Sequence, residues 1–205
     1  MAIVNYTGSF EKEINMFEEH DEFVVGKLRT IASKIGELNS SWNDDNSHKY
    51  LSTFNDALVE LKNDLDKSHI DVARYFSQIQ DVLDKFGTHS HVELSQLPSI
   101  DISAINASNG DGSISINEEK VSAILSEMQD NTNAAINKCN DFHPTAVSMQ
   151  GSSDDVYGAV QSNLDAAASC YLVIVEPLKK INGIVSNVLA DYAKRSSAII
   201  DATAR

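Results

Sequence analysis

The sequence predicts an all-α protein in which two tandem long helical hairpins dock into an elongated antiparallel four-helix bundle. Its 205 residues include only 3 Pro and 9 Gly, too few turn-forming residues for a multistranded sandwich or barrel. Apolar residues recur at steps of three and four along most of the chain, as on one face of a helix. Two polar turns and a longer linker interrupt this pattern, so the plan of helix, turn and helix occurs twice. We expect a first hairpin over residues 1–90, a linker over 91–115 and a second hairpin over 116–205.

The composition excludes several classes of protein. There are 30 acidic residues against 16 Lys and Arg, which gives a formal net charge of −14. Such a charge repels phosphate and anionic lipid, so we expect no nucleic-acid partner and no polybasic membrane surface. At 42% hydrophobic residues, the chain is not a disordered acidic tail. No apolar stretch approaches the length of a membrane span, and residues 1–25 lack the pattern of a cleavable signal peptide.

The first hairpin has two apolar seams separated by a polar segment over residues 39–47. The seam of its first helix, interrupted at Asp21, consists of Phe10, Ile14, Phe17, Val24, Leu28, Ile31, Ile35 and Leu38. The second helix is expected to begin at Asp44, Asp45 or Ser47, whose side chains can cap free amides. Its seam is a seven-residue repeat with one polar interruption at Ser68, and it predicts a helix of about 40 residues. That seam consists of Leu51, Phe54, Leu58, Leu61, Leu65, Val72, Tyr75, Ile79, Val82 and Phe86.

The second hairpin repeats this plan around a polar turn at residues 143–155. The seam of its first helix, predicted to span roughly 30 residues, consists of Val121, Leu125, Met128, Thr132, Ala135, Cys139 and Phe142. The seam of its second helix consists of Tyr157, Val160, Leu164, Ala167, Tyr171, Ile174, Leu178, Ile181, Val185, Val188, Tyr192 and Ile199. Pro177 falls inside this last helix and should bend it or relax one of its turns.

The two cysteines are expected to be unbridged buried thiols. If the second hairpin turns near residue 150, Cys139 lies opposite roughly residue 160. Cys170 is then about 10 residues, or ~15 Å of helical rise, further along. That separation is too large for a disulfide.

Each predicted turn carries half of a known motif. Residues 41–44 read Ser-Trp-Asn-Asp, with Trp42 in place and Asp44 where a Trp-x-Gly motif has Gly. Residues 148–151 read Ser-Met-Gln-Gly, with Gly151 in place and Met149 where the motif has Trp. On these turns and the helices around them, the chain resembles two divergent hairpins of the WXG family, small helical-hairpin proteins exported by type VII secretion systems.

The resemblance implies a non-catalytic protein that is secreted without a cleavable signal peptide to the outside or surface of a bacterium. Its implied partners are the type VII secretion machinery and a co-secreted protein. Pairing of the two hairpins within one chain would replace the family's hairpin dimer and give a monomer. The family's export tag, Tyr-x-x-x-Asp/Glu, is not found: Ile79, Val175 and Ser196 stand four residues after Tyr75, Tyr171 and Tyr192. Trp42 is expected to pack the end of its hairpin as an aromatic staple.

The linker matches much of an EF-hand calcium loop at residues 107–118. Gly112 occupies the position of the sharp turn, but Ala107 stands where the first carboxylate is required. The candidate calcium ligands are Asn109, Asp111, Ser113 and Glu118. The alternative is a polar, Gly-rich turn whose Ser and Asn side chains cap the third helix.

No other pattern indicates a cofactor or an enzyme. His89 and His91 are close in sequence, but no Cys or carboxylate spacing completes a zinc site, and the other histidines (His20, His48, His69 and His143) are scattered. The acidic pairs at 44–45 and 154–155 are explained by helix capping. No nucleophile elbow, phosphate loop or dinucleotide fingerprint is present. Two alternatives to a secretion substrate remain: a calcium-responsive binding module using residues 107–118, and an α-helical membrane-active protein, against which the polar turns count.

Overall fold

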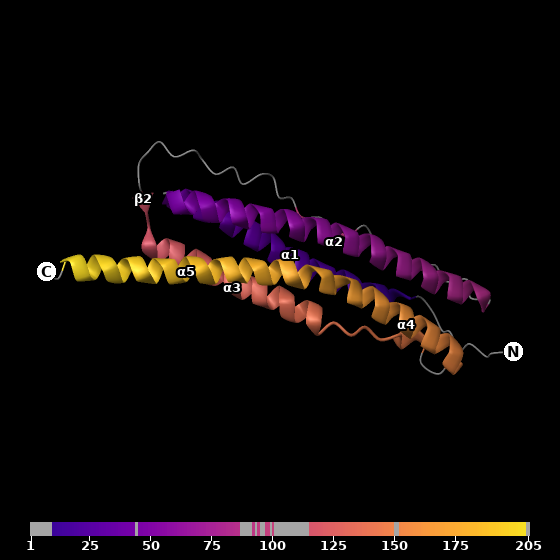
Figure 1. Ribbon diagram of the computed structural model, residues 1–205. Coiled ribbons are helices and arrows are strands. Elements are labelled where there is room, and N and C mark those ends of the chain that lie inside the picture. Colours follow the sequence, from indigo (N-terminus) through magenta and orange to yellow (C-terminus); the bar gives the residue numbers. More distant parts are fainter. Residues whose placement is uncertain are drawn as a thin grey trace. The chain divides into compact units, whose positions relative to one another are not determined.

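The computed structural model is an all-α helical bundle, which confirms the predicted fold class (Figure 1). It describes residues 10–43, 45–86, 92, 94, 97–98, 100, 115–149 and 152–203. In chain order the elements are α1 (Glu11–Ser41), β1 (Trp42–Asn43), α2 (Asp45–Lys85), β2 (Ser115–Ile116), α3 (Glu118–Asn140), η1 (Val147–Met149), α4 (Asp154–Ser169), η2 (Cys170–Ile174) and α5 (Val175–Thr203).

The contacts divide the chain into two compact units, and each unit contains segments of both predicted hairpins. Unit 1 contains α1 up to Gly26, α2 from Asn63 onward, and residues 137–175. Unit 2 contains the rest of α1 from Lys27, α2 up to Lys62, β2, α3 up to Ile136, and α5 from Glu176. The division therefore does not follow the predicted hairpin boundaries at residues 1–90 and 116–205.

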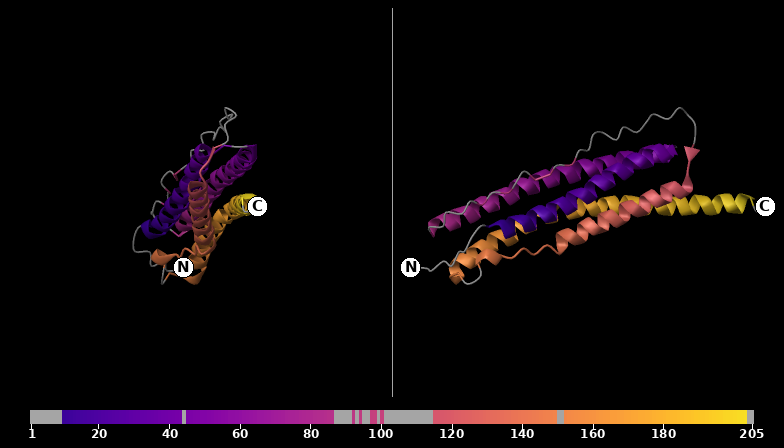
Figure 2. Two further views of the ribbon diagram at one scale, coloured as in Figure 1. Left: turned by 90° about the vertical axis from the view of Figure 1, so that its left-hand side faces the viewer. Right: turned by 180° about the vertical axis from the view of Figure 1, so that it is seen from behind.

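The two helices of the first predicted hairpin have the expected lengths, 31 residues for α1 and 41 for α2. In unit 2 the chain reverses at β1, which pairs antiparallel with β2 so that Trp42 lies opposite Ile116. The amide of Asn117 also donates to the carbonyl of Ser41 at 3.2 Å. The end of the linker is thus hydrogen-bonded to the first turn, which the sequence analysis did not predict. Figure 2 shows β2 leading directly into α3.

In unit 1 the seam of α2 departs from the predicted seven-residue repeat. After Ser68 the buried residues are Val72, Phe76, Ile79 and Leu83, whereas Phe86 is 41% exposed. Tyr75 and Val82, predicted to lie in the seam, are only partly buried. The reason is geometric: a straight α-helix has about 3.6 residues per turn, so a strict seven-residue repeat drifts off one face within a few turns.

The connection after α3 differs from the prediction as well. α3 has 23 residues and ends at Asn140, short of the roughly 30 residues expected. Residues 142–146 then continue without helical structure to η1. Non-helical chain can advance up to about 3.3 Å per residue, against about 1.5 Å in a helix, so the same number of residues can place the turn further from the end of α3. The prediction that Cys139 lies opposite residue 160 is therefore wrong: Cys139 lines a surface cleft with Ala168 and Leu172.

The relaxed turn expected near Pro177 is present. The five residues of η2 form a 3₁₀ helix, and the amide of Val175 donates to the carbonyl of Leu172. Proline lacks an amide hydrogen, and its ring crowds the carbonyl four residues earlier, here that of Val173. The preceding turn therefore tightens, and it places Tyr171 fully inside unit 1.

Candidate functional site

The first turn, in unit 2, buries the tryptophan on which the family resemblance depends. Trp42 is 3% exposed, and its ring lies 5.9 Å from the rings of both Tyr50 and Tyr192. The indole Nε1 has no hydrogen-bond partner among the described residues. Trp42 thus acts through its apolar surface, in the position of the expected aromatic staple. Asp44, the other residue of this motif, lies outside the described residues.

Polar contacts in unit 2 surround this aromatic group at the surface. The Tyr50 hydroxyl donates to the carboxylate of Asp191, whose Oδ1 lies 4.0 Å from Lys194 Nζ. These three residues line a shallow surface cleft of about 380 Å³ between α2 and α5, together with Lys49, Thr53, Ile184, Asn187 and Ala190.

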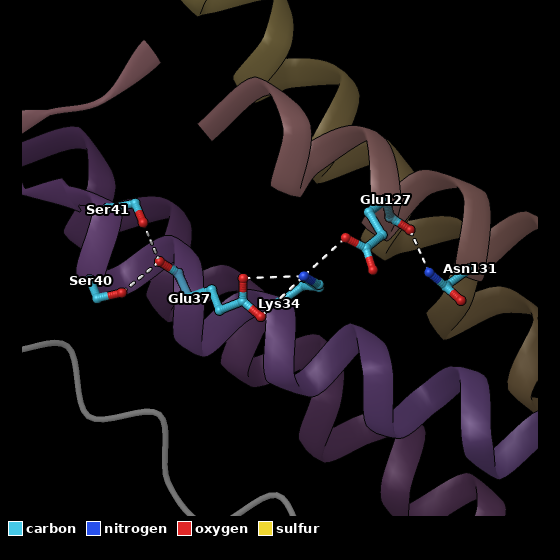
Figure 3. Close-up of polar contacts among 6 residues, drawn as sticks. All are labelled: Lys34, Glu37, Ser40, Ser41, Glu127 and Asn131. Carbon is cyan, nitrogen blue, oxygen red and sulfur yellow. Dashed lines mark hydrogen bonds and ion pairs between the residues drawn. The ribbon is translucent and has the colours of Figure 1, made fainter. Parts of the chain in front are cut away.

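The last turns of α1 carry a second polar group, shown in Figure 3. Lys34 Nζ lies 2.9 Å from Glu127 on α3 and 3.1 Å from Glu37. Hydrogen bonds to Glu127 and Glu37 raise the pKa of Lys34. The hydroxyls of Ser40 and Ser41 each donate to the carbonyl of Glu37 at 2.8 Å. This network joins α1 to α3, and the two hydroxyls give the Glu37 carbonyl additional donors near the end of α1.

The second turn, in unit 1, is held by a buried carboxylate. Met149 is fully buried in η1, so it fills space at the second turn as Trp42 does at the first. Glu13 of α1 is also fully buried and accepts from the amide of Ser148 at 2.7 Å and from its hydroxyl at 2.9 Å. Gln161 accepts from the amide of Ala146 and donates to the carbonyl of Pro144, both at 2.9 Å. Gly151 lies outside the described residues.

Four polar side chains of unit 1, His20, Asp21, His69 and Tyr171, lie close together, and we call them the His20 cluster. Asp21 is 0% exposed and its Oδ1 lies 2.7 Å from His69 Nε2. His20 stacks on Phe142 with ring centroids 3.9 Å apart, and its ring meets Tyr171 edge-on at 4.5 Å. The prediction that Asp21 merely interrupts the seam is wrong, because Asp21 is buried and paired across to α2.

Burial favours the neutral forms of three groups here, His20, Cys139 and Tyr171. Loss of solvation, with a smaller contribution from Lys138, lowers the pKa of His20 from 6.5 to about 3. Burial raises the pKa of Cys139 to about 12, and it raises the pKa of Tyr171, with Asp21 adding to both effects. A thiol that stays protonated at neutral pH is a poor nucleophile.

A small surface cleft adjoins the His20 cluster in unit 1. It measures about 260 Å³, and it contains Phe142, which stacks on His20. The remaining lining residues are Cys139, Asn140, His143, Asp165, Ala168, Ser169 and Leu172. Both cysteines are unbridged: Cys139 is buried as expected, whereas Cys170 is only partly buried.

Glu13 and His20 were not predicted as site residues, although the sequence contains a signal for both. From Phe10, just before α1, to the end of the α1 segment in unit 1, the buried residues are Phe10, Glu13, Phe17, His20, Asp21, Val24 and Val25. Phe10, Glu13, Phe17, His20 and Val24 follow one another at steps of three and four. Glu13 and His20 therefore occupy seam positions, but they are polar, and the apolar Ile14, only partly buried, was assigned to the seam instead.

The calcium prediction remains a prediction. Asn109, Asp111 and Ser113 lie outside the described residues, and Glu118 is the exposed first residue of α3. Asn117 Oδ1 accepts from the amide of Lys120 at 3.0 Å, and it thereby caps α3. In the part of the chain that the structure describes, no group of three or more His, Cys, Asp or Glu side chains is arranged to hold a metal ion.

Comparisons with protein-family models, curated proteins and solved structures found no match. Within the described residues, no helix combines the length and apolar character that crossing a membrane requires.

Proposed function

We propose that the chain is a non-catalytic, secreted partner-binding protein of a type VII secretion system, built as a fused pair of WXG-like hairpins. The observation that carries the proposal is the burial of Trp42 at the first helical turn. A tryptophan at this place in a hairpin is the defining residue of the family that the turns resemble. Met149, buried in the second turn, supports the same role for the other half of the motif.

Contacts between the two predicted hairpins support pairing within one chain. In unit 2, Trp42 of the first hairpin packs against Tyr192 of the second, and Lys180 lies 2.6 Å from Glu60. In unit 1, Glu13 of the first hairpin accepts two hydrogen bonds from Ser148 of the second. Such contacts give each apolar seam a partner at high effective concentration, so the chain needs no second copy.

Partner binding, rather than catalysis, is also what the buried titratable groups His20 and Cys139 favour. A nucleophile or general base works best with a pKa near the operating pH. His20 and Cys139 have theirs moved far from neutral, in the directions that keep both groups uncharged. We therefore assign these residues to the core and place function on the outer surface of the bundle.

The export proposal is tested by removing the type VII ATPase in the source organism and measuring the protein outside the cell. We expect the extracellular protein to disappear while the cellular amount persists. A protein exported with a cleavable signal peptide serves as the export control, and a cytoplasmic enzyme reports lysis. Secretion that continues without the ATPase would overturn the proposal.

The pairing proposal has a separate test in sedimentation and solution scattering of the purified chain. We expect a helical monomer across a wide range of concentrations. A stable dimer would mean that the seams pair between chains, as in the hairpin family itself. Trp42→Phe, which keeps an aromatic ring, should leave the protein monomeric in the same measurements.

A further inference from the structure

His20 is a histidine whose folded surroundings do not accommodate a second proton. It is 1% exposed, with Phe142 flat against one face and Tyr171 edge-on at 4.5 Å. Neither ring nitrogen has a hydrogen-bond partner among the described residues. An imidazolium carries two N–H donors and a charge, and burying such a group without acceptors is costly.

None of the described titratable groups around His20 is hydrogen-bonded to its ring nitrogens. On its own helix, Asp21 uses Oδ1 to bind His69 of α2 at 2.7 Å. On α3, Lys138 adds positive charge near the ring, and the neighbouring Cys139 stays a neutral thiol. On η2, Tyr171 stays a neutral phenol because burial raises its pKa. His20 can therefore take up a proton readily only when these elements separate.

We propose that the His20 cluster is an acid-sensitive latch: proton uptake by His20 opens unit 1 while unit 2 stays folded. The inference does not depend on the secretion proposal, because it rests on the core of unit 1 alone. Opening exposes the apolar side chains packed around the cluster, among them Phe17, whose ring meets those of both Phe76 and Phe142 at 4.9 Å.

The sign of the effect follows from where the proton binds. In the open chain His20 titrates at its ordinary pKa of 6.5, whereas in the folded unit its pKa is about 3. The open state therefore binds more protons between these two values. The contribution of neutral His20 to stability is complete above pH 6.5 and is lost as the pH falls toward 3. The opening equilibrium rises roughly tenfold for each pH unit in this window.

Amide hydrogen exchange of the full chain, followed by mass spectrometry on peptides from each unit, tests the latch. Between pH 7.5 and 5.5 most carboxylates stay ionised, so the histidines dominate the change. After correction for intrinsic exchange rates, we expect peptides of unit 1 to report an opening equilibrium constant about 10-fold larger at pH 5.5 than at pH 7.5. Peptides of unit 2, whose described residues include the partly exposed His48, should change by less than about 2-fold.

Three variants and one spectroscopic measurement make the result decisive. His20→Leu should remove the pH dependence of unit 1, whereas His143→Gln, at an exposed position in the same unit, should keep it. His69→Gln separates the contribution of the Asp21 pair from that of His20. If His20→Leu does not fold, NMR of the unmodified protein still tests the latch, because the folded His20 ring should stay neutral at pH 5.5. A ring that titrates near 6.5 in the folded state, or equal opening in both units, would overturn the proposal.

Discussion

Units 1 and 2 are both helical, but they place their polar side chains differently. In unit 1, Glu13, His20 and Asp21 are at most 1% exposed, and they bind or stack inside the core. In unit 2 the ion pair between Lys180 and Glu60 joins side chains that are 56% and 44% exposed. Thr132 is buried there, but its hydroxyl donates a hydrogen bond to the carbonyl of Met128. Among the described residues, the same helical spacing therefore closes over a core with buried Glu, His and Asp side chains in unit 1 and over one without them in unit 2.

This difference determines how each unit responds to change. A buried hydrogen bond, such as that between Asp21 and His69, adds modest net stability because it replaces hydrogen bonds to water, but removing one partner leaves an unpaired polar group inside the protein. An exposed pair is screened by water and salt, so its loss matters little. We expect unit 1 to be sensitive to single polar substitutions and to pH, and unit 2 to depend mainly on the volume that its core side chains fill.

The largest expected effect tests that dependence in unit 2. Trp42→Ala removes a nearly fully buried indole between Tyr50 and Tyr192, and it should lower the free energy of unfolding of unit 2 by about 4 kcal/mol. Chemical denaturation followed by tyrosine fluorescence and by hydrogen exchange measures the change. Met149→Ala is the matched change at the second turn and should lower the stability of unit 1 instead, by about 2–4 kcal/mol. A loss of under ~1 kcal/mol for Trp42→Ala would show that the first turn is not held by packing.

The next effect concerns the polar core of unit 1. Asp21→Ala leaves His69 without its partner at 2.7 Å, and it should lower the stability of unit 1 by about 3 kcal/mol. Glu60→Ala, which removes the exposed pair with Lys180, should lower the stability of unit 2 by less than ~1 kcal/mol. Thermal and urea unfolding of both variants give the comparison. Equal losses would remove the distinction between the two units.

Glu13 provides a test within unit 1. Glu13→Ala deletes the acceptor of two hydrogen bonds from Ser148 and should cost about 2–3 kcal/mol, measured by urea unfolding. Glu13→Gln keeps one side-chain oxygen and should cost less. Glu19→Ala, at an exposed position of the same helix, serves as the control and should have little effect. If Glu13→Ala resembles Glu19→Ala, the second turn does not depend on the Glu13 hydrogen bonds, and Met149 and Gln161 hold it.

The smallest expected effects have opposite signs. Ser68 is buried in unit 1, and its Oγ has no hydrogen-bond partner among the described residues. Ser68→Ala should therefore leave stability unchanged or raise it by up to ~1 kcal/mol. Thr132 in unit 2 donates to the carbonyl of Met128 at 2.7 Å, so Thr132→Val should lower stability by about 1 kcal/mol. Differential scanning calorimetry resolves both shifts.

Hydrophobic spacing predicted the helices but not the character of the core of unit 1. The lengths of α1 and α2 and the relaxed turn before Pro177 follow from local rules of spacing and proline geometry. Whether Asp21 points inward depends instead on His69, 48 positions away in the chain. Spacing places a residue on a face, but only its partner on another helix makes burial of a polar side chain favourable. The prediction of the α2 seam past Ser68 was wrong for a different reason, the small difference between 3.5 and 3.6 residues per turn.

The candidate site residues divide in the same way. Trp42 and Met149 were found because each stands at a turn with a recognisable motif, and both are buried. Glu13, His20 and Gln161 were not found, because their partners come from segments that the sequence does not place beside them. The non-helical residues 142–146 are one cause, because they include Phe142 and Ala146 and no periodicity marks their positions.

The pairing of β1 with β2 has a consequence for the order in which the protein folds. It joins Asn43 to Ser115, so it closes a loop of about 70 residues that contains the whole of α2. Closing so long a loop costs conformational entropy before its few hydrogen bonds can form, whereas the reversal between α1 and α2 is local and costs less. We therefore expect the α1–α2 reversal to form early in folding and the β1–β2 pairing to form late, as the step that fixes the start of α3 beside the end of α1.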